Sequence, residues 1–330
     1  MKSALVVGQK LVSVLLTLLL VSLLIFLIFQ VIPGDAVLAR LGLDADPALE
    51  ALLREEMRLD QPYWRRYLLW LNDLLQGDLG ASLRFGRPVA TMIADSLPNT
   101  VALATLSFIE VLALGIPLGL WLYSGDHTDG SDAGKGFLWR CRRFVAGLVR
   151  GLMHLLLAIP VFALAIILML VFAVWLRWLP LSGYVSWSEN FPLFMYSLIL
   201  PSFAISLPSV AMVIRYLLTS LQEQSSLAYT RTALSKGLSS EQTLKRHMLR
   251  NALVPVLTIL GVILINTLGG SIVVEATFGI PGIGQLLNTA IRSRDLPLVQ
   301  GISFYIALVV TLGYLLLDLL YMAVDPRISS

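Results

Sequence analysis

The sequence predicts an all-α protein that crosses a membrane six times, and two observations carry this prediction. Hydrophobic residues make up 57% of the 330 residues and charged residues only 14%, against about 25% charged in an ordinary soluble chain. The charged residues also gather in clusters, so the stretches between them are long and apolar, and the mean hydropathy is +0.81. This composition excludes a soluble globular enzyme, a disordered chain and a disulfide scaffold.

Six apolar stretches come close to the ~20 residues that a helix needs to cross a bilayer. Two of them contain one charge each, Glu110 and Asp318, and the others contain none. The first is longer than the apolar core of a cleaved signal peptide, so we expect a retained helix. Pro160, Pro201 and Pro208 lie inside spans, where neighbouring helices can satisfy the freed carbonyl groups. The six predicted spans are residues 11–32, 101–123, 152–176, 191–214, 252–274 and 299–324.

Lys and Arg in the connecting segments predict the orientation of the chain. The two termini and segments 124–150 and 215–251 together hold fourteen Lys and Arg, whereas the alternate short loops hold three. We therefore expect both termini on the cytoplasmic side. The net charge of +3 is then explained by topology and needs no nucleic acid. Cys141 is the single cysteine, so it can form neither an internal disulfide nor a cysteine metal site.

The segment between the first two spans, residues 33–98, is too long for a plain loop. Residues 63–75 carry apolar side chains at helical spacing, and we expect Asp60 near the N-cap of this helix and Pro62 in its first turn. Residues 77–80, Gly-Asp-Leu-Gly, are typical of a turn. The segment therefore predicts a small extracytoplasmic helical cap.

Residues 229–242, between the fourth and fifth spans, predict a helix, a turn and a second helix. Gly237 suits the left-handed position that ends a helix, and Lys236 suits the negative end of its dipole. Ser239 and Gln242 have the spacing of a capping box for the next helix, which would continue into the fifth span. From the pattern alone, a docking device and a well-capped connector that touches nothing are equally supported.

This loop resembles the "EAA" loop of ABC-importer permeases, whose general form is Glu-Ala-Ala, three residues, then Gly. Here Arg231, Thr232 and Ala233 are followed after three residues by Gly237. The replaced Glu, together with Arg-His-Met-Leu-Arg-Asn-Ala-Leu-Val-Pro at 246–255, is similar to the permeases of dipeptide, oligopeptide and nickel importers. Because Arg231 stands where the general motif has Glu, a salt bridge of that Glu cannot be carried over.

Further segments extend the resemblance over nearly the whole chain. The subunit that the chain resembles is the first, or "B"-type, inner-membrane permease of these importers. Each segment is weak alone, but together, in order, they are strong. They are residues 59–63, 77–80, 86–89, 97–100, 178–184 and 275–284, and Asp318 with residues 325–328.

The resemblance implies a type I importer permease (MetI-like) fold. Its organisation would be an N-terminal tail and first helix at 1–32, the extracytoplasmic segment at 33–98, and a five-span core at 99–330 with a coupling loop at 220–251. It also implies a homologous second permease, two cytoplasmic ATPases in whose clefts the loop sits, an extracytoplasmic binding protein, and the bacterial inner membrane as location. The residues expected to couple to the ATPases are Tyr229, Arg231, Thr232, Ala233, Lys236, Gly237, Leu238 and Ser239.

The chain itself is expected to bind no cofactor and to hold no catalytic residue and no metal. The nearest approach to a phosphate-binding loop, residues 130–136, has three residues between its glycines where four are needed and no hydroxyl after Lys135. We interpret it as a linker, so ATP and Mg would belong to the partner ATPases. Segment 124–143 is longer and more polar than the family leads us to expect.

Ionisable residues inside spans are functional candidates by default. Glu110 could line the substrate path or act as a proton site, with a structural hydrogen bond between helices as the alternative, which we favour for Asp318. Asn266 and Thr267 suit either close helix packing or the permeation path. His154 is expected to be a structural polar residue.

Three functions are open to a membrane protein of this kind. The first is the permease subunit of an ATP-driven importer of di- or oligopeptides, with nickel or a metal–chelator complex as the alternative cargo. The second is a stand-alone secondary transporter that uses Glu110, and the third is an intramembrane enzyme. An inverted repeat would favour the second, and a nucleophile–base set or metal cluster would favour the third. Neither feature is visible in the sequence.

Overall fold

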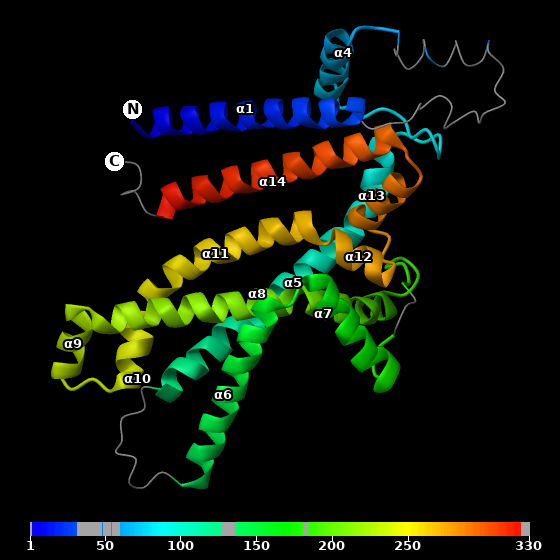
Figure 1. The fold of residues 1–330 in the computed structure, drawn as a ribbon. Helices are drawn as coiled ribbons and strands as arrows, with labels where there is room; N and C mark the ends of the chain where they lie inside the picture. The colour runs from blue at the N-terminus through cyan, green and yellow to red at the C-terminus, as the bar shows by residue number, and fades with distance from the viewer. Residues whose placement is uncertain are drawn as a thin grey trace. The chain divides into compact units, whose positions relative to one another are not determined.

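The computed structural model describes residues 2–31, 48, 54, 60–126, 136–180 and 184–324. Within these residues the regular secondary structure is helical, apart from an isolated bridge between Ala81 and Pro88, and turns and short irregular segments connect the helices. The helices, with π-helical pieces written η (Figure 1), are α1 (Lys2–Val31), α4 (Tyr63–Leu75), α5 (Val89–Asp126), α6 (Phe137–Ala158), α7 (Val161–Leu168), η1 (Met169–Trp175), α8 (Phe191–Ser226), α9 (Ala228–Ser235), α10 (Ser240–Thr243), η2 (Leu244–Met248), α11 (Leu249–Gly270), α12 (Ile272–Phe278), α13 (Ile283–Arg292) and α14 (Leu296–Val324).

Five helical stretches in the described part of the chain are long and apolar enough to cross a membrane: Val7–Gln30, Val89–Gly125, Phe191–Ser226, Ser240–Leu268 and Leu296–Leu320. They contain five of the six predicted spans, except for the last residues at the ends of three of those spans.

The third predicted span, residues 152–176, is divided among the end of α6, α7 and η1. Proline has no N–H and pushes the residue before it out of the helical region, so Ile159 is extended (φ −81°, ψ 130°). Pro160 therefore separates two helices, whereas Pro201 and Pro208 lie inside α8.

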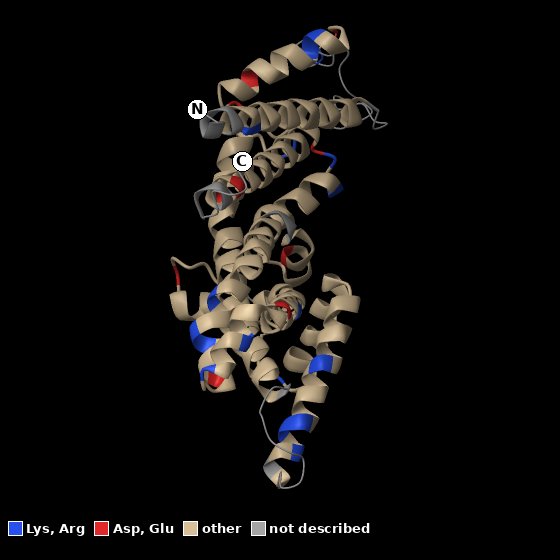
Figure 2. Cartoon of the chain, turned by 90° about the vertical axis from the view of Figure 1, so that its left-hand side faces the viewer, with Lys and Arg blue, Asp and Glu red and all other residues tan. Residues whose placement is uncertain are grey.

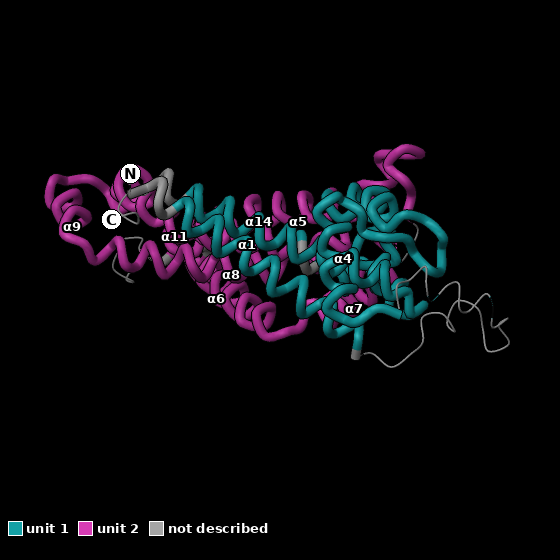
Figure 3. Tube along the Cα trace, turned by 90° about the horizontal axis from the view of Figure 1, so that it is seen from above, with its two compact units in different colours: residues 1–101, 268–330 teal, residues 102–267 magenta. Residues whose placement is uncertain are grey.

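The chain divides into two compact units, coloured separately in Figure 3: residues 1–101 with 268–330, and residues 102–267. We call them unit 1 and unit 2. The buried core of unit 1 is formed by side chains of α5, α13 and α14, and Val89, Leu298 and Ile302 are fully buried in it. In unit 2 the core surrounds α8, where Val213, Leu217 and Leu221 are fully buried.

In unit 1, α1 packs against α14, and Lys10 forms an ion pair with Asp318 between these two helices. Asp318 thus takes part in a contact between helices, the role favoured for it.

Helix α4 packs on α1. The Tyr67 hydroxyl lies 2.9 Å from Ser22 Oγ, and Arg66 donates to Gln30 Oε1 at 3.0 Å. The predicted helix at 63–75 is confirmed with the same bounds, but its N-cap is Pro62 and no side chain caps it. Asp60 lies two residues before this N-cap, near it as predicted, whereas Pro62 is the N-cap itself and not part of the first turn. The turn at 77–80 is confirmed by the positive φ angles of Gly77 and Gly80.

Several sequence-based expectations fall outside the described residues. They concern most of the segment 33–59, the linker containing residues 130–135, residues 181–183 of one external loop, and the C-terminal signature at 325–328.

Candidate functional site

The predicted coupling loop is a compact elbow that follows α8 directly. A single extended residue, Leu227 (φ −75°, ψ 151°), turns the chain from α8 into α9. Thr230 then donates its hydroxyl to the carbonyl of Gln224 at 2.8 Å, and the Tyr229 hydroxyl donates to Gln224 Oε1 at 2.6 Å. These two bonds hold the start of α9 against the last turn of α8.

Helix α9 has an inner and an outer face. Thr230 and Ala233, three residues apart, are 3% and 7% exposed, and residues at this spacing share one face of a helix. Arg231, Thr232 and Lys236 are exposed. A small side chain at 233 lets α9 lie close to the protein, and the residues beside it are left free to meet a partner.

The turn after α9 is built around Gly237, which has a φ of 87°. Its N–H donates to Leu234 O at 2.9 Å and the N–H of Leu238 donates to Ala233 O at 3.3 Å. This pair of bonds closes a helix end in which a glycine takes the left-handed conformation. The prediction for Gly237 is confirmed. A Cβ at this position would meet nothing within 4 Å, so the glycine is required only by the backbone conformation.

The second arm of the elbow begins with the predicted capping box. Gln242 N donates to Ser239 Oγ at 3.2 Å and Ser239 N donates to Gln242 Oε1, also at 3.2 Å. Helix α10 then runs without interruption through η2 into α11, as the sequence predicts. Because the elbow is continuous with α8 on one side and α11 on the other, a force on it acts on two long helices at once.

The outer surface of the elbow is basic. Figure 2 shows the Lys and Arg residues of this part of unit 2 in blue. Glu241 is ion-paired with Lys245 at 2.6 Å, so the acidic residue adds little negative potential. Exposed basic side chains along the elbow and its continuation are Arg231, Lys236, Lys245, Arg246, His247 and Arg250.

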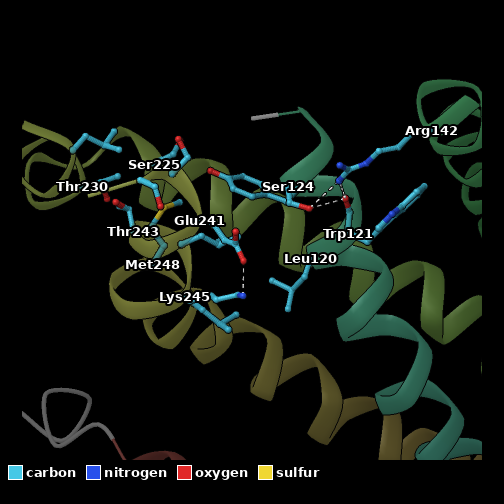
Figure 4. A pocket seen from close by; sticks show the side chains of 16 residues that line it. Leu120, Trp121, Ser124, Arg142, Ser225, Thr230, Glu241, Thr243, Lys245 and Met248 are labelled. Atoms are coloured by element: carbon cyan, nitrogen blue, oxygen red, sulfur yellow. Dashed lines mark hydrogen bonds and ion pairs between the residues drawn. The ribbon is translucent and has the colours of Figure 1, made fainter. Parts of the chain in front are cut away.

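A cavity of about 1090 Å³ lies beside the elbow within unit 2. Side chains from α9, α10 and η2 form one wall, and the ends of α5 and α8 with Arg142 of α6 form the others (Figure 4). Arg142 donates to the carbonyl of Trp121 at 3.2 Å and to Ser124 Oγ at 3.1 Å, which ties α6 to the end of α5. A hollow therefore lies between the elbow and the ends of α5 and α6.

The membrane carboxylate Glu110 is held by α8. Ser202 and Ser206, one helical turn apart and fully buried, donate to its two carboxylate oxygens at 2.6 Å each. Thr267 is buried and bonds within its own helix, to Ile263 O at 2.7 Å, whereas Asn266 is exposed. The bonds of Glu110 are those expected of a structural link between α5 and α8. His154 is exposed on α6.

Sequence reasoning missed a second carboxylate, Glu275 of unit 1, which is fully buried. Thr100 and Ser271 donate their hydroxyls to Oε1 at 2.8 and 2.6 Å. The N–H groups of Gly284 and Gln285, at the first turn of α13, donate to Oε2 at 2.7 and 3.3 Å. A carboxylate at a helix N-terminus satisfies N–H groups that have no partner inside the helix.

Two glycines make room for this carboxylate. A Cβ on Gly282 would lie 2.3 Å from Glu275 Oε2, and one on Gly284 would lie 2.2 Å from Ile272 Cα. Glycines are thus required after Glu275 because a β-carbon at these positions would collide with the carboxylate or with α12. The signal available in the sequence was an acidic residue directly after an apolar span and before closely spaced glycines.

Comparisons with known proteins agree with the resemblance read from the sequence. Residues 134–330 match the family described as "Binding-protein-dependent transport system inner membrane component". Residues 4–104 match the N-terminal region described for such membrane components.

Curated relatives cover nearly the whole chain. It is 33% identical over 320 residues to a probable peptide ABC transporter permease of Sinorhizobium fredii, with 97% of both chains covered. It is 34% identical over 316 residues to the oligopeptide transport permease AppB of Bacillus subtilis (94% of both). It is 33% identical over 320 residues to the glutathione transport permease GsiC of Escherichia coli (97% of both). Among solved structures, a chain of the MetNI methionine ABC transporter matches with a TM-score of 0.49 and 16% identity, covering 71% of this chain and 96% of that one.

Proposed function

Because the chain belongs to the family of binding-protein-dependent transport system inner membrane components, we propose that it is one of two homologous permease subunits of an ATP-driven peptide importer. Together the two permeases enclose the translocation path. Two cytoplasmic ATPases, which hold the ATP and Mg, bind beneath them, and an extracytoplasmic binding protein delivers the substrate. In this arrangement both termini and the elbow face the cytoplasm. This chain performs no catalysis itself.

The elbow from Leu227 to Gln242 is the observation that carries the proposed coupling role. Both of its arms are closed by defined hydrogen bonds, at Gly237 and at Ser239. A coupling element must transmit displacement, since ATP can bias two permease states only through contacts that differ between them. A capped elbow continuous with α8 and α11 is suited to this task, and its basic outer face would favour an acidic cleft on a partner.

The names of the relatives support a peptide as cargo. They are described as transporting peptides, oligopeptides and glutathione, itself a peptide. We propose that the substrate specificity resides largely in the binding protein. Glu110, Asn266 and Thr267 would line the translocation path and contact the substrate only secondarily. Nickel or a metal chelate is the alternative cargo.

Co-purification tests the proposed coupling. The chain is extracted from native membranes in mild detergent, and its stoichiometric companions are identified by mass spectrometry. We expect a homologous permease and one or two kinds of ATPase. Gly237→Asp places a β-carbon and a charge at the left-handed position, so the ATPases should be lost while the permease pair is kept.

Gly77→Asp is a matched control. Gly77 also ends a helix in the left-handed region, with a φ of 79° and nothing within 4 Å of a Cβ, but it follows α4. It carries a similar backbone cost at a site predicted to be extracytoplasmic, so it should retain the ATPases. Equal loss of ATPases in both variants would contradict a specific role of the elbow. A chain that purifies without ATPases and moves solute without ATP would instead support the secondary transporter.

The cargo is tested separately by uptake into cells that lack the chromosomal copy of this gene. Labelled di- and tripeptides are compared with labelled nickel, alone and as a chelate, with and without the restored gene. Gene-dependent uptake of peptide alone supports the proposal. Gene-dependent uptake of nickel alone would leave the coupling role intact and replace the cargo.

A further inference from the structure

Helix α6 is a long helix to which the proposed function assigns no role. It is not among the helices of the described chain that are apolar enough to span a membrane, although it has 22 residues. It ends at Ile159–Pro160, where α7 continues in a different direction (Figure 1). At 1.5 Å per residue, the apolar stretch Val161–Trp175 is about 22 Å long, so only the last turns of α6 are needed to complete the ~30 Å hydrocarbon thickness. The N-terminal half of α6 is not required for the crossing.

The direction of α6 indicates where this half lies. Within unit 2, α6 packs on α8 and runs across it instead of along it (Figure 1). A span such as α8 is oriented along the membrane normal to within a modest tilt. A helix that crosses it steeply extends along the membrane plane.

The side chains of α6 form three faces. One face packs into the core of unit 2 through Met153 and Leu156, which are 8% and 7% exposed, and through Arg142 bound to the end of α5. The second face is apolar and exposed. On a helical projection its members fall on one side, about a third of a turn from the core face. They are Phe137 (79% exposed), Phe144 (68%), Val145 (45%), Leu148 (58%), Leu152 (53%) and Leu155 (53%).

The third face is polar and basic, and it separates the other two on one side. It carries Arg140 and Arg143, both exposed, together with Arg150, His154 and small glycines. Arg143 lies over the ring of Trp139 at 5.2 Å, so an aromatic ring accompanies the charge. Between Phe137 and Ala158 there are four arginines and no acidic residue.

We propose that the N-terminal half of α6 lies in the interface of the cytoplasmic leaflet and binds anionic phospholipid headgroups. An exposed apolar face with a basic strip beside it matches a helix that immerses its apolar side at the acyl boundary. Its arginines then meet the negative lipid surface. The arrangement also accounts for Arg140 and Arg143 in the polar segment 124–143. The inference rests on the proposed membrane orientation but not on the cargo.

Cys141 provides the test, because it is the single cysteine of this chain, is exposed and lies within the apolar face. The purified permease complex is spin-labelled there and reconstituted into vesicles of phosphatidylcholine alone, or of equal phosphatidylcholine and phosphatidylglycerol. The accessibility of the label to oxygen and to a water-soluble nickel complex reports its depth. We expect an immersed label in the anionic vesicles and a larger water-exposed fraction in the neutral ones.

The double variant Arg140→Gln/Arg143→Gln should reduce the immersed-to-exposed ratio in anionic vesicles by about fivefold for each arginine. Arg84→Gln/Arg177→Gln removes the same charge from exposed positions elsewhere and should leave the ratio unchanged. Phe144→Gln/Leu148→Gln should make the label more water-exposed in both kinds of vesicle, because it removes apolar area from the face that is immersed in the membrane.

Three results would overturn the inference. A label that is water-exposed in both vesicles places the helix in the cytoplasm. A label shielded from both reagents even in detergent is covered by protein. Immersion that ignores both phosphatidylglycerol and the arginines removes the role of anionic lipid. None of these readouts needs ATP or cargo, so they are independent of the tests of transport and coupling.

Discussion

Two helix–turn–helix segments of this chain use glycine for different physical reasons. In the elbow of unit 2, Gly237 has a φ of 87° and open space around it. In unit 1, Gly282 before α13 and Gly284 in its first turn have ordinary negative or extended backbone, but no room for a Cβ. The first turn is held by backbone conformation and caps at the surface. The second is held around the buried carboxylate of Glu275.

The contrast teaches what local sequence patterns can reveal. A helix end with Gly and a following capping box is a short-range signal, because all partners lie within a few residues. The Glu275 site joins Thr100 to residues 271–285. The site depends on a contact between positions 175 residues apart. A pattern within a short stretch of sequence cannot reveal such a contact. The substitutions below test this difference.

Glu275→Ala should have the largest effect. It leaves three buried donors and one part-buried donor without their acceptor, at about 1–3 kcal/mol for each buried donor when unrelieved, so we expect a loss on the order of 4 kcal/mol in the free energy of unfolding. The measurement is unfolding of the detergent-solubilised complex by a denaturing detergent. Glu275→Gln keeps one acceptor oxygen and should lose less. An alanine variant as stable as wild type would show that the Glu275 carboxylate does not stabilise this turn.

Gly284→Ala should cost about 3 kcal/mol, because the new Cβ meets backbone at Ile272 and one of the two helices must move. Its control is Gly279→Ala in the same segment. Gly279 has a φ of 67° with nothing within 4 Å of a Cβ, so only the backbone conformation opposes the change, at about 1–2 kcal/mol. Melting temperatures of the two variants, measured side by side, should separate in that order. The reverse order would show that α12 and α13 can move apart at little cost in free energy.

Gly237→Ala should cost about 1–2 kcal/mol for the left-handed conformation alone. Gly237→Asn should recover part of this loss, because Asn tolerates that conformation. No such recovery is expected for Gly284→Asn, where the obstacle is volume. If Asn were as harmful as Ala at 237, an unrecognised contact would have to surround this turn.

Glu110→Gln should have the smallest effect on stability, below about 1 kcal/mol. The amide oxygen can still accept from one serine, and its NH₂ can donate to the other. Ser202→Ala/Ser206→Ala, which removes both donors, should cost more than the glutamine variant. A stable Glu110→Gln complex that loses peptide uptake would assign this residue to the substrate path. A large loss of stability would mean that the charge itself is needed.

The sequence by itself determined the membrane class, the helical fold and the elbow, because each depends on composition or on residues a few positions apart. The apolar stretches predicted most spans, and the positions of Gly237, Ser239 and Gln242 predicted the turn and cap that the structure contains. The resemblance added the family, since it used many weak segments in order along the whole chain.

Only the tertiary structure decided which polar groups in apolar surroundings meet, and how the third span is made. Glu110 drew attention as a lone charge, yet Ser202 and Ser206 satisfy it from another helix. Glu275, assigned no role, proved to be the fully buried junction of its unit. Pro160 divided a stretch that hydropathy read as continuous. Hydropathy records how much a segment is to be buried, but not its direction or its partners, and those follow from packing.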